Sequence, residues 1–173
     1  DLEKLISKKT KGIVTVNYAG IGCDYDKIRD LISGRNILII EDNAQGLLSK
    51  HDGKYLGTYG DLSTISFHNT KNISCGEGGA LLIPKSREGL IQKAKIMREK
   101  GTNRYNFVRG EIDKYTWQDL GSSYLPSELN AAILLANLEE SLNKTKKRIT
   151  AWNNYITKAD ASSRKLKFPF YMR

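Results

Sequence analysis

The feature that most constrains the fold of this chain is an apolar run that stops at two acidic residues. The run Ile37–Ile40 is unbroken, and Glu41 and Asp42 follow it directly. Strands of a parallel sheet are buried on both faces, so they read as continuous apolar runs of this kind. Open α/β sheets bind their ligands at the carboxyl ends of such strands. We therefore expect Asp42 to stand at a ligand-binding edge.

The segments on either side of this run fit the same sheet. β-branched residues between positions 12 and 18 predict a strand, and Asp24 or Asp26 can cap a helix that precedes Ile37. Another β-like run, 62–67, lies further along the chain. This order predicts an α/β fold, a mostly parallel sheet flanked by helices.

A polar loop follows the run 62–67 and carries Lys71. An acid and a lysine at neighbouring strand ends suit pyridoxal phosphate, because lysine holds this cofactor as a Schiff base while a carboxylate keeps its ring nitrogen protonated. Asp42 and Lys71 have these chemistries, Gln45 can bind a ring oxygen, and Ser66 can donate to the phosphate. Taken one at a time, the same residues also fit ordinary roles, such as a strand-end acid or a solvated loop lysine.

Four segments carry a resemblance to a known family through their residues, order and spacing. They are EDNAQ at 41–45, GTYGD at 57–61, SFHNTKN at 66–72 and GEGGA at 76–80. Together they resemble the pyridoxal-phosphate-dependent sugar aminotransferases of the DegT/DnrJ/EryC1/StrS type, which act on nucleotide-linked keto sugars. KGTNR at 100–104 and GSSYL at 121–125 resemble the branch that aminates dTDP-4-dehydro-6-deoxy-D-glucose at C4 to dTDP-4-amino-4,6-dideoxy-D-galactose, with glutamate as amino donor.

The resemblance implies the large domain of an aspartate-aminotransferase-like fold, incomplete here. It implies that Lys71 bonds the cofactor, that Asp42 pairs with the pyridine nitrogen, and that Gln45 and Ser66 lie near the ring oxygen and the phosphate. It also implies a homodimer, in which an Asn of a Gly-Tyr-Asn pattern reaches the neighbour's phosphate, and Ser123 stands at that position here. A related sugar dehydratase has histidine at the lysine position, and Lys71 argues against that alternative.

Relatives of this family carry an earlier segment and a later C-terminal domain. We therefore expect these 173 residues to be a central piece of a larger enzyme. Residues 1–143 are expected to form part of the cofactor-binding large domain. Residues 144–173 are expected to form a basic helix and the start of a connection to a further domain.

The composition limits the class of protein. A hydrophobic content of 39% with 27% charged residues is ordinary for a globular chain, and no apolar run approaches the ~20 residues of a membrane span. We expect a cytoplasmic protein, so Cys23 and Cys75 should be free thiols. His51 and His68 have no partners at ligand spacing, so no metal site is expected.

The basic excess is concentrated near the C-terminus. The net charge is +9, and residues 141–173 hold nine Lys or Arg against one acid, Asp160. This leaves an alternative function, a non-catalytic fragment or binding module whose basic tail contacts nucleic acid or another polyanion, with Trp152, Tyr155 and Phe168 available for stacking. A solvated helix face is the preferred interpretation, so a nucleic-acid partner is not expected.

Two helices and a loop are expected in the second half of the chain. One helix should begin near Ser86 and end at Gly101, and another, capped by Ser127, should continue through Tyr155. The segment 102–123 between them is interpreted as a long functional loop, because loops of this length are uncommon unless they bind something.

Overall fold

The computed structural model describes residues 1–161. The chain divides into two compact units, 1–134 and a second that begins at Leu135. Both cysteines, Cys23 and Cys75, are free thiols.

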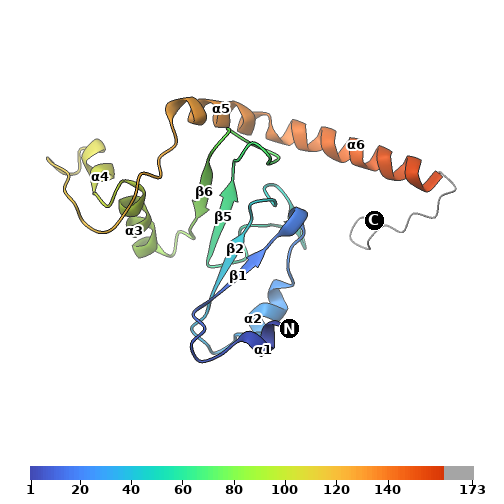
Figure 1. Cartoon of the computed structure of the whole chain (residues 1–173), viewed down its shortest axis with the longest axis horizontal. Coiled ribbons are helices and arrows are strands. Elements are labelled where there is room, and N and C mark those ends of the chain that lie inside the picture. Colours follow the sequence, from blue (N-terminus) through green and yellow to red (C-terminus); the bar gives the residue numbers. More distant parts are fainter. Residues whose placement is uncertain (162–173) are drawn as a thin grey trace. The chain divides into compact units, whose positions relative to one another are not determined.

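A four-stranded sheet forms the centre of the first unit (Figure 1). Its order is β1-β2-β5-β6, in which β1, β2 and β5 are parallel and β6 is antiparallel to β5. The expectation of an α/β fold with a mostly parallel sheet is confirmed. The strands are β1 (Gly12–Val16), β2 (Leu38–Asp42), β5 (Leu62–Ser66) and β6 (Gly79–Leu82).

Helix α2 (Tyr25–Leu31) connects β1 to β2. The Asp24 side chain accepts a hydrogen bond from the backbone N–H of Lys27 at 3.1 Å, which confirms one of the two expected N-caps. Before β1 lies the short helix α1 (Leu2–Leu5), and after it a 3-10 turn, η1 (Tyr18–Gly20).

The core lies between the sheet and α2. Tyr25 of α2 is 1% exposed and its ring stacks on that of Tyr59, with ring centroids 4.6 Å apart. The opposite face of β1 stays exposed, since Val14 and Val16 are 64% and 49% accessible. The sheet is therefore covered on one face within this unit. The buried cluster consists of Ile13, Tyr25, Ile32, Ile37, Ile39 and Leu56.

A small hairpin separates β2 from β5. Its strands are β3 (Lys50–His51) and β4 (Lys54–Tyr55). Asp52 and Gly53 form the turn, with φ of 46° and 77°. Positive φ at both turn residues is the two-residue geometry that matches the twist of paired strands.

The segment after β6 differs from its expected form. Helix α3 is Glu88–Arg98, so it begins after Ser86, with Arg87 at the N-cap position. Residues 102–123 are not a plain loop, because they contain helix α4 (Arg104–Val108) and an isolated antiparallel bridge between Thr102 and Trp117. The loop expectation was wrong in this respect, since local pairing organises the segment.

Two helices complete the described chain. The N-cap at Ser127 is confirmed, since its hydroxyl accepts from the N–H of Asn130 at 3.1 Å at the start of α5 (Glu128–Glu139). The expected single helix is broken after Glu139, and α6 (Ser141–Ala161) follows as a separate helix. Phe168 and the last four basic positions lie outside the described residues. None of the described helices is both long and apolar enough to cross a membrane.

Candidate active site

Two rows of side chains cross the carboxyl ends of the parallel strands, one on each face of the sheet. Strand pairing aligns Val16 with Asp42 and Asp42 with Thr64. Because side chains alternate along a strand, the preceding residues form a second row on the opposite face. That second row is buried and consists of Thr15, Glu41 and Ser63. Asp42 therefore belongs to the face that α2 leaves uncovered.

Asp42 is fixed by its own backbone surroundings. It is half-buried at the last position of β2, where one carboxylate oxygen accepts from the N–H of Ala44 at 3.1 Å. Its backbone carbonyl accepts from the N–H of Asn17 at 3.0 Å. The turn that follows the strand thus sets the direction of the carboxylate through one oxygen. The second oxygen is the one that can bind a ligand.

Glu41, the neighbour of Asp42, connects β2 to the loop 57–60 on the opposite face of the sheet. Its side chain is fully buried, and its two oxygens accept backbone N–H bonds from Gly57, Tyr59 and Gly60 at 2.7, 2.5 and 2.6 Å. The side-chain amide of Asn17 donates a further bond to it at 3.1 Å. A buried carboxylate needs such partners, because an unpaired charge in the interior is costly.

This role of Glu41 was not predicted from the sequence. The available signal was the glycine-rich segment 57–61, whose close approach to a strand end suits backbone donors. A Cβ added at Gly60 would lie 2.7 Å from the carbonyl oxygen of Ile39, so the loop can approach the strand only with glycine there.

A polar network continues from Glu41 toward α2. The hydroxyl of Tyr25 donates to the side-chain oxygen of Asn17 at 2.6 Å, and the amide of Asn17 also donates to Asn43 at 3.1 Å. Burial raises the pKa of Tyr25 to about 12, with a smaller contribution from the negative charge of Glu41. Tyr25 therefore stays protonated at neutral pH and serves as a structural donor.

Ser66 ends the neighbouring strand β5 on the same face as Asp42. It lies two residues beyond Thr64, the partner of Asp42 in the register, and alternation returns it to that face. Its hydroxyl oxygen accepts from the N–H of His68 at 3.3 Å, and the side chain is half-buried. The hydroxyl hydrogen remains available for an anionic ligand.

Lys71 lies in the loop between β5 and β6, and buried side chains of this loop attach it to the protein interior. Three residues of this loop, Phe67, Ile73 and Cys75, are buried to 6% exposure or less. The N–H of Lys71 donates to the carbonyl of His68 at 2.9 Å, and the N–H of Cys75 donates to that of Phe67 at 2.9 Å. The half-buried Lys71 is thus held on a closed, anchored loop just beyond the end of β5.

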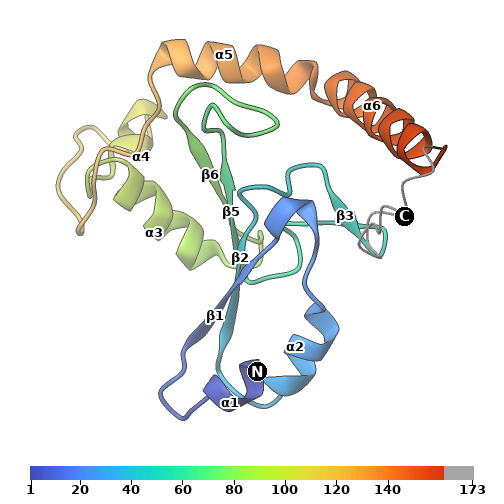
Figure 2. The ribbon, with the colours of Figure 1, turned by 45° about the vertical axis from the view of Figure 1, so that its right-hand side comes forward.

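The two other expected site residues lie in different surroundings. Gln45 is exposed a short step beyond Asp42, and its side-chain oxygen accepts from the N–H of Ala19 at 2.8 Å. Ser123 is exposed on the segment that follows α4, where it bridges to Glu99. Figures 1 and 2 show this segment beside α3 and α4, away from β2. The structure thus gathers Asp42, Ser66 and the Lys71 loop at one edge, with Gln45 beside them and Ser123 apart.

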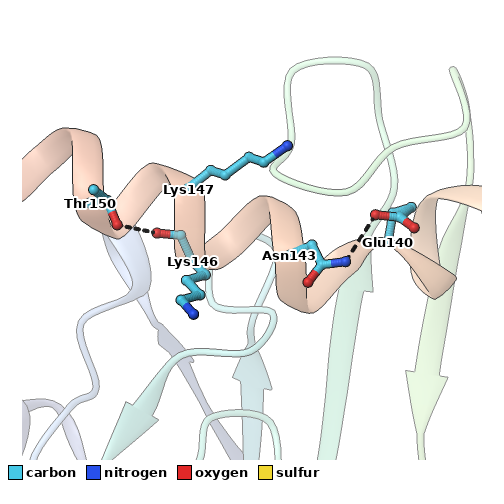
Figure 3. A pocket seen from close by; sticks show the side chains of 5 residues that line it. All are labelled: Glu140, Asn143, Lys146, Lys147 and Thr150. Carbon is cyan, nitrogen blue, oxygen red and sulfur yellow. Dashed lines mark hydrogen bonds between the residues drawn. The ribbon is translucent and has the colours of Figure 1, made fainter.

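A hollow on α6 offers no comparable chemistry. It is lined by Glu140 and by side chains from α6 alone, among them Asn143, Lys146 and Thr150 (Figure 3). Asn143 donates to Glu140 at 3.2 Å, and the Thr150 hydroxyl donates to the carbonyl of Lys146 at 3.1 Å. Such contacts are those of an ordinary solvated helix face. In the described part of the chain, no group of three or more His, Cys, Asp or Glu could hold a metal ion.

Comparison with known proteins decides the family. Residues 1–170 match the DegT/DnrJ/EryC1/StrS aminotransferase family. This chain belongs to that family. It is 36% identical over 142 residues to GDP-perosamine synthase of Escherichia coli O157:H7, covering 82% of this chain and 36% of that protein. It is 30% identical over 154 residues to UDP-4-amino-4,6-dideoxy-N-acetyl-beta-L-altrosamine transaminase of Helicobacter pylori, covering 89% of this chain and 39% of that protein.

A solved aminotransferase structure has the same fold. Helicobacter pylori PseC, an aminotransferase involved in the biosynthesis of pseudoaminic acid, superposes with a TM-score of 0.78 at 29% identity. The match covers 89% of this chain and 40% of that one. The chain therefore spans about two fifths of the length of these relatives.

Pyridoxal phosphate is the cofactor of DegT/DnrJ/EryC1/StrS aminotransferases, and the donor set at the β2–β5 edge fits it. Asp42 supplies a carboxylate and Ser66 a hydroxyl on one face, and Lys71 supplies a primary amine from the adjoining loop. These are the three chemistries that a protonated pyridine ring, a phosphate and an aldehyde carbon require.

Proposed function

We propose that this chain carries the cofactor-binding part of a nucleotide-sugar aminotransferase. The observation that carries the proposal is the placement of Asp42 and Ser66 on one face at the ends of the adjacent parallel strands β2 and β5, with Lys71 five residues further on. Lys71 would bond the cofactor and Asp42 would pair with its ring nitrogen. Gln45 would contact the ring oxygen, and Ser66, with Ser123 of a second copy in a homodimer, would contact the phosphate.

The bound cofactor would supply an electron sink, which makes a proton on the carbon next to the amino group of glutamate removable. The chain's own residues would do the rest. Lys71 Nζ, freed from its bond to the cofactor when the amino group of glutamate takes its place, would take that proton and return it to the neighbouring carbon of the cofactor, so its anchored loop must keep the amine within reach of both carbons. Asp42 would hold a proton on the ring nitrogen by its negative charge, and the rigid end of β2 keeps the carboxylate directed.

The sugar and its nucleotide are proposed from two kinds of likeness. The stretch 100–125 supports dTDP-4-dehydro-6-deoxy-D-glucose as the acceptor, with the 4-amino-4,6-dideoxygalactose sugar as product. The two relatives named above are instead named for GDP-linked and UDP-linked sugars, and their identity of 30% or more supports those nucleotides as the second candidate. The shared reaction is amination of a keto sugar attached to a nucleoside diphosphate.

The proposed cellular setting is the cytoplasm. The free thiols of Cys23 and Cys75 fit a reducing compartment. Family membership favours the aminotransferase over a module that binds nucleic acid through its basic tail. The basic residues of α6 would then form a solvated surface.

Nitrogen transfer tests the proposal. The complete gene product that contains this sequence is supplied with ¹⁵N-glutamate and, in separate reactions, with dTDP-, GDP- and UDP-linked 4-keto-6-deoxy sugars. Mass spectrometry should find ¹⁵N in the sugar with one of the three nucleotides, dTDP first among them. Absence of nitrogen transfer to all three would contradict the proposed function.

A further inference from the structure

His68 is bonded to two residues that are proposed to contact the cofactor. Its backbone N–H donates to the hydroxyl oxygen of Ser66 at 3.3 Å, and its backbone carbonyl accepts from the N–H of Lys71 at 2.9 Å. Both His68 and Lys71 belong to the loop that connects the neighbouring strands β5 and β6 (Figures 1 and 2). The imidazole ring of His68 is half-buried, and none of the roles assigned above involves it.

The Nδ1 atom of His68 closes the turn that carries Lys71. The backbone N–H of Thr70 donates to Nδ1 at 3.3 Å, and the Thr70 hydroxyl oxygen lies 2.9 Å from the same atom. Because a backbone N–H can only donate, Nδ1 is the acceptor, and the hydrogen of the neutral ring lies on Nε2. The ring thus bonds the residue directly before Lys71, while the backbone carbonyl bonds Lys71 itself.

The Nε2 atom of His68 faces the returning part of the loop. It lies 3.5 Å from a carboxylate oxygen of Glu77, a suitable acceptor for the hydrogen on Nε2. The backbone carbonyl of Glu77 accepts from the side-chain amide of Asn130 at 2.9 Å and from the thiol of Cys75 at 3.4 Å. The ring of His68 therefore lies between a residue whose backbone is held and the turn that carries Lys71.

The ladder of β5 and β6 stops short of Lys71. It continues into the loop as far as the bond from the N–H of Asn69 to the carbonyl of Gly76, at 2.9 Å. Lys71 lies two residues beyond Asn69, so the direction of its backbone depends on the bonds within the turn 68–71. In that turn His68 accepts from Thr70 through its ring and from Lys71 through its carbonyl.

We propose that His68 is a positioning residue for Lys71, because its Nδ1 atom holds the turn that directs the Lys71 amine toward the cofactor. The inference rests on the proposed function, since it takes Lys71 as the residue that bonds pyridoxal phosphate. His68 acts through the backbone of Thr70 and Lys71. A loosened turn would present the amine in many directions, so its condensation with the cofactor aldehyde, which releases water, would be slower.

Two amide variants separate the roles of the two ring nitrogens. In His68→Asn the side-chain oxygen takes the place of Nδ1, because asparagine in turns accepts from the N–H two residues further on. In His68→Gln the amide is one carbon further out, so it reaches toward Glu77 and not back to Thr70. We expect His68→Asn to keep the position of Lys71, and His68→Gln to lose it as His68→Ala does. His51→Ala, at the other histidine of the chain, is the matched control.

Hydrogen exchange measures the turn without cofactor. The complete gene product that contains this sequence is stripped of cofactor, and deuterium uptake is followed by mass spectrometry on peptides that span 68–72. Uptake in His68→Ala and His68→Gln should be faster than in the parent by about fivefold, because one hydrogen bond is lost. His68→Asn and His51→Ala should match the parent. Equal uptake in the parent and His68→Ala would overturn the inference.

The rate of labelling connects the turn to the cofactor. Each protein is mixed with pyridoxal phosphate and reduced with borohydride after timed intervals, and mass spectrometry measures how fast pyridoxyl-Lys71 appears. The rate should fall about fivefold in His68→Ala and His68→Gln and should be retained in His68→Asn. An unchanged rate in His68→Ala, or an equal loss in His68→Asn, would overturn the inference.

The outcome is separable from that of the proposed function. If Lys71 is labelled in the parent and at the same rate in His68→Ala, this inference is lost and the cofactor site is kept. If Lys71 is not labelled in the parent, although deuterium uptake depends on His68, the assignment of Lys71 is lost and its positioning by His68 with it.

Discussion

The carboxylate of Glu41 accepts the backbone N–H of Gly60 at 2.6 Å, joining two residues that are 19 positions apart. This bond ties the loop after the hairpin to the end of β2, directly behind Asp42. Since Glu41 and Asp42 are consecutive in a strand, their side chains point to opposite faces. The buried Glu41 therefore fixes the strand end that carries the half-buried Asp42.

Replacement of Glu41 should destabilise the fold strongly. Glu41→Gln puts an amide donor where backbone N–H groups converge, so at least one buried N–H loses its acceptor, and we expect a loss of about 3 kcal/mol in the free energy of unfolding. Urea denaturation followed by circular dichroism measures it. Glu139→Gln, at an exposed acid of α5, is the control and should change stability little. Equal stability of the two variants would contradict the role given to Glu41.

Tyr25 should titrate only at high pH. Its folded pKa of about 12 is above the ordinary value of 10.0, because burial disfavours the phenolate. The stability that depends on the protonated hydroxyl is therefore complete below pH ~10 and is lost as pH rises toward about 12. Tyrosinate absorbance during an alkaline titration should show a late step that coincides with unfolding.

The variant Tyr25→Phe checks this titration. It should lack the late step, and its free energy of unfolding should fall by about 1 kcal/mol, since Asn17 loses a donor. Tyr18→Phe changes an exposed ring, 70% accessible, and serves as the control. A late step that persists in Tyr25→Phe would refute the assignment.

The cap of α2 should give the opposite dependence on pH. Bonding to the Lys27 side chain, and then to its backbone N–H, lowers the pKa of Asp24. Its contribution is therefore present above the unfolded pKa of Asp24 and is lost as pH falls through the lower folded pKa. Asp24→Asn should be slightly less stable than the parent at neutral pH, and the difference should close in acid. A difference that stays constant with pH would show that the charge of Asp24 is not involved.

Two glycines should respond to alanine in opposite directions. Gly60→Ala places a methyl group 2.7 Å from the carbonyl oxygen of Ile39, so it should destabilise the fold. Gly89, in the first turn of α3, has nothing within 4 Å of an added Cβ, and Gly89→Ala should stabilise by about 0.5 kcal/mol. Thermal denaturation of both variants compares them directly. The opposite order would contradict the close approach of the loop to β2.

The local parts of this structure could be predicted from the sequence, and the long-range parts could not. The run that stops at Asp42 predicted a strand and its end, and the pair Asp24 and Asp26 predicted a helix start, because both signals lie within a few residues. The role of Glu41 depends on donors 16 to 19 residues away, which a pattern does not reveal. The pairing of Thr102 with Trp117 was not predicted from the sequence for the same reason.

The candidate site shows the same division. The residue types at Asp42, Ser66 and Lys71 indicated the cofactor chemistry, and the order of β2 and β5 then gave the first two a common face. Ser123 was predicted as a phosphate contact through family resemblance alone. Within one chain it lies on the segment that follows α4, apart from Asp42 and Ser66. Its proposed contact needs a second copy, which no local pattern describes.

Reduction of the cofactor adduct tests the central claim most directly. The chain is incubated with pyridoxal phosphate, reduced with borohydride, digested, and searched by mass spectrometry for a pyridoxyl lysine, with Lys71→Ala treated in parallel. The account predicts a label confined to Lys71 in the parent and lost in the variant. Label spread over surface lysines, or equal labelling of parent and variant, would contradict it.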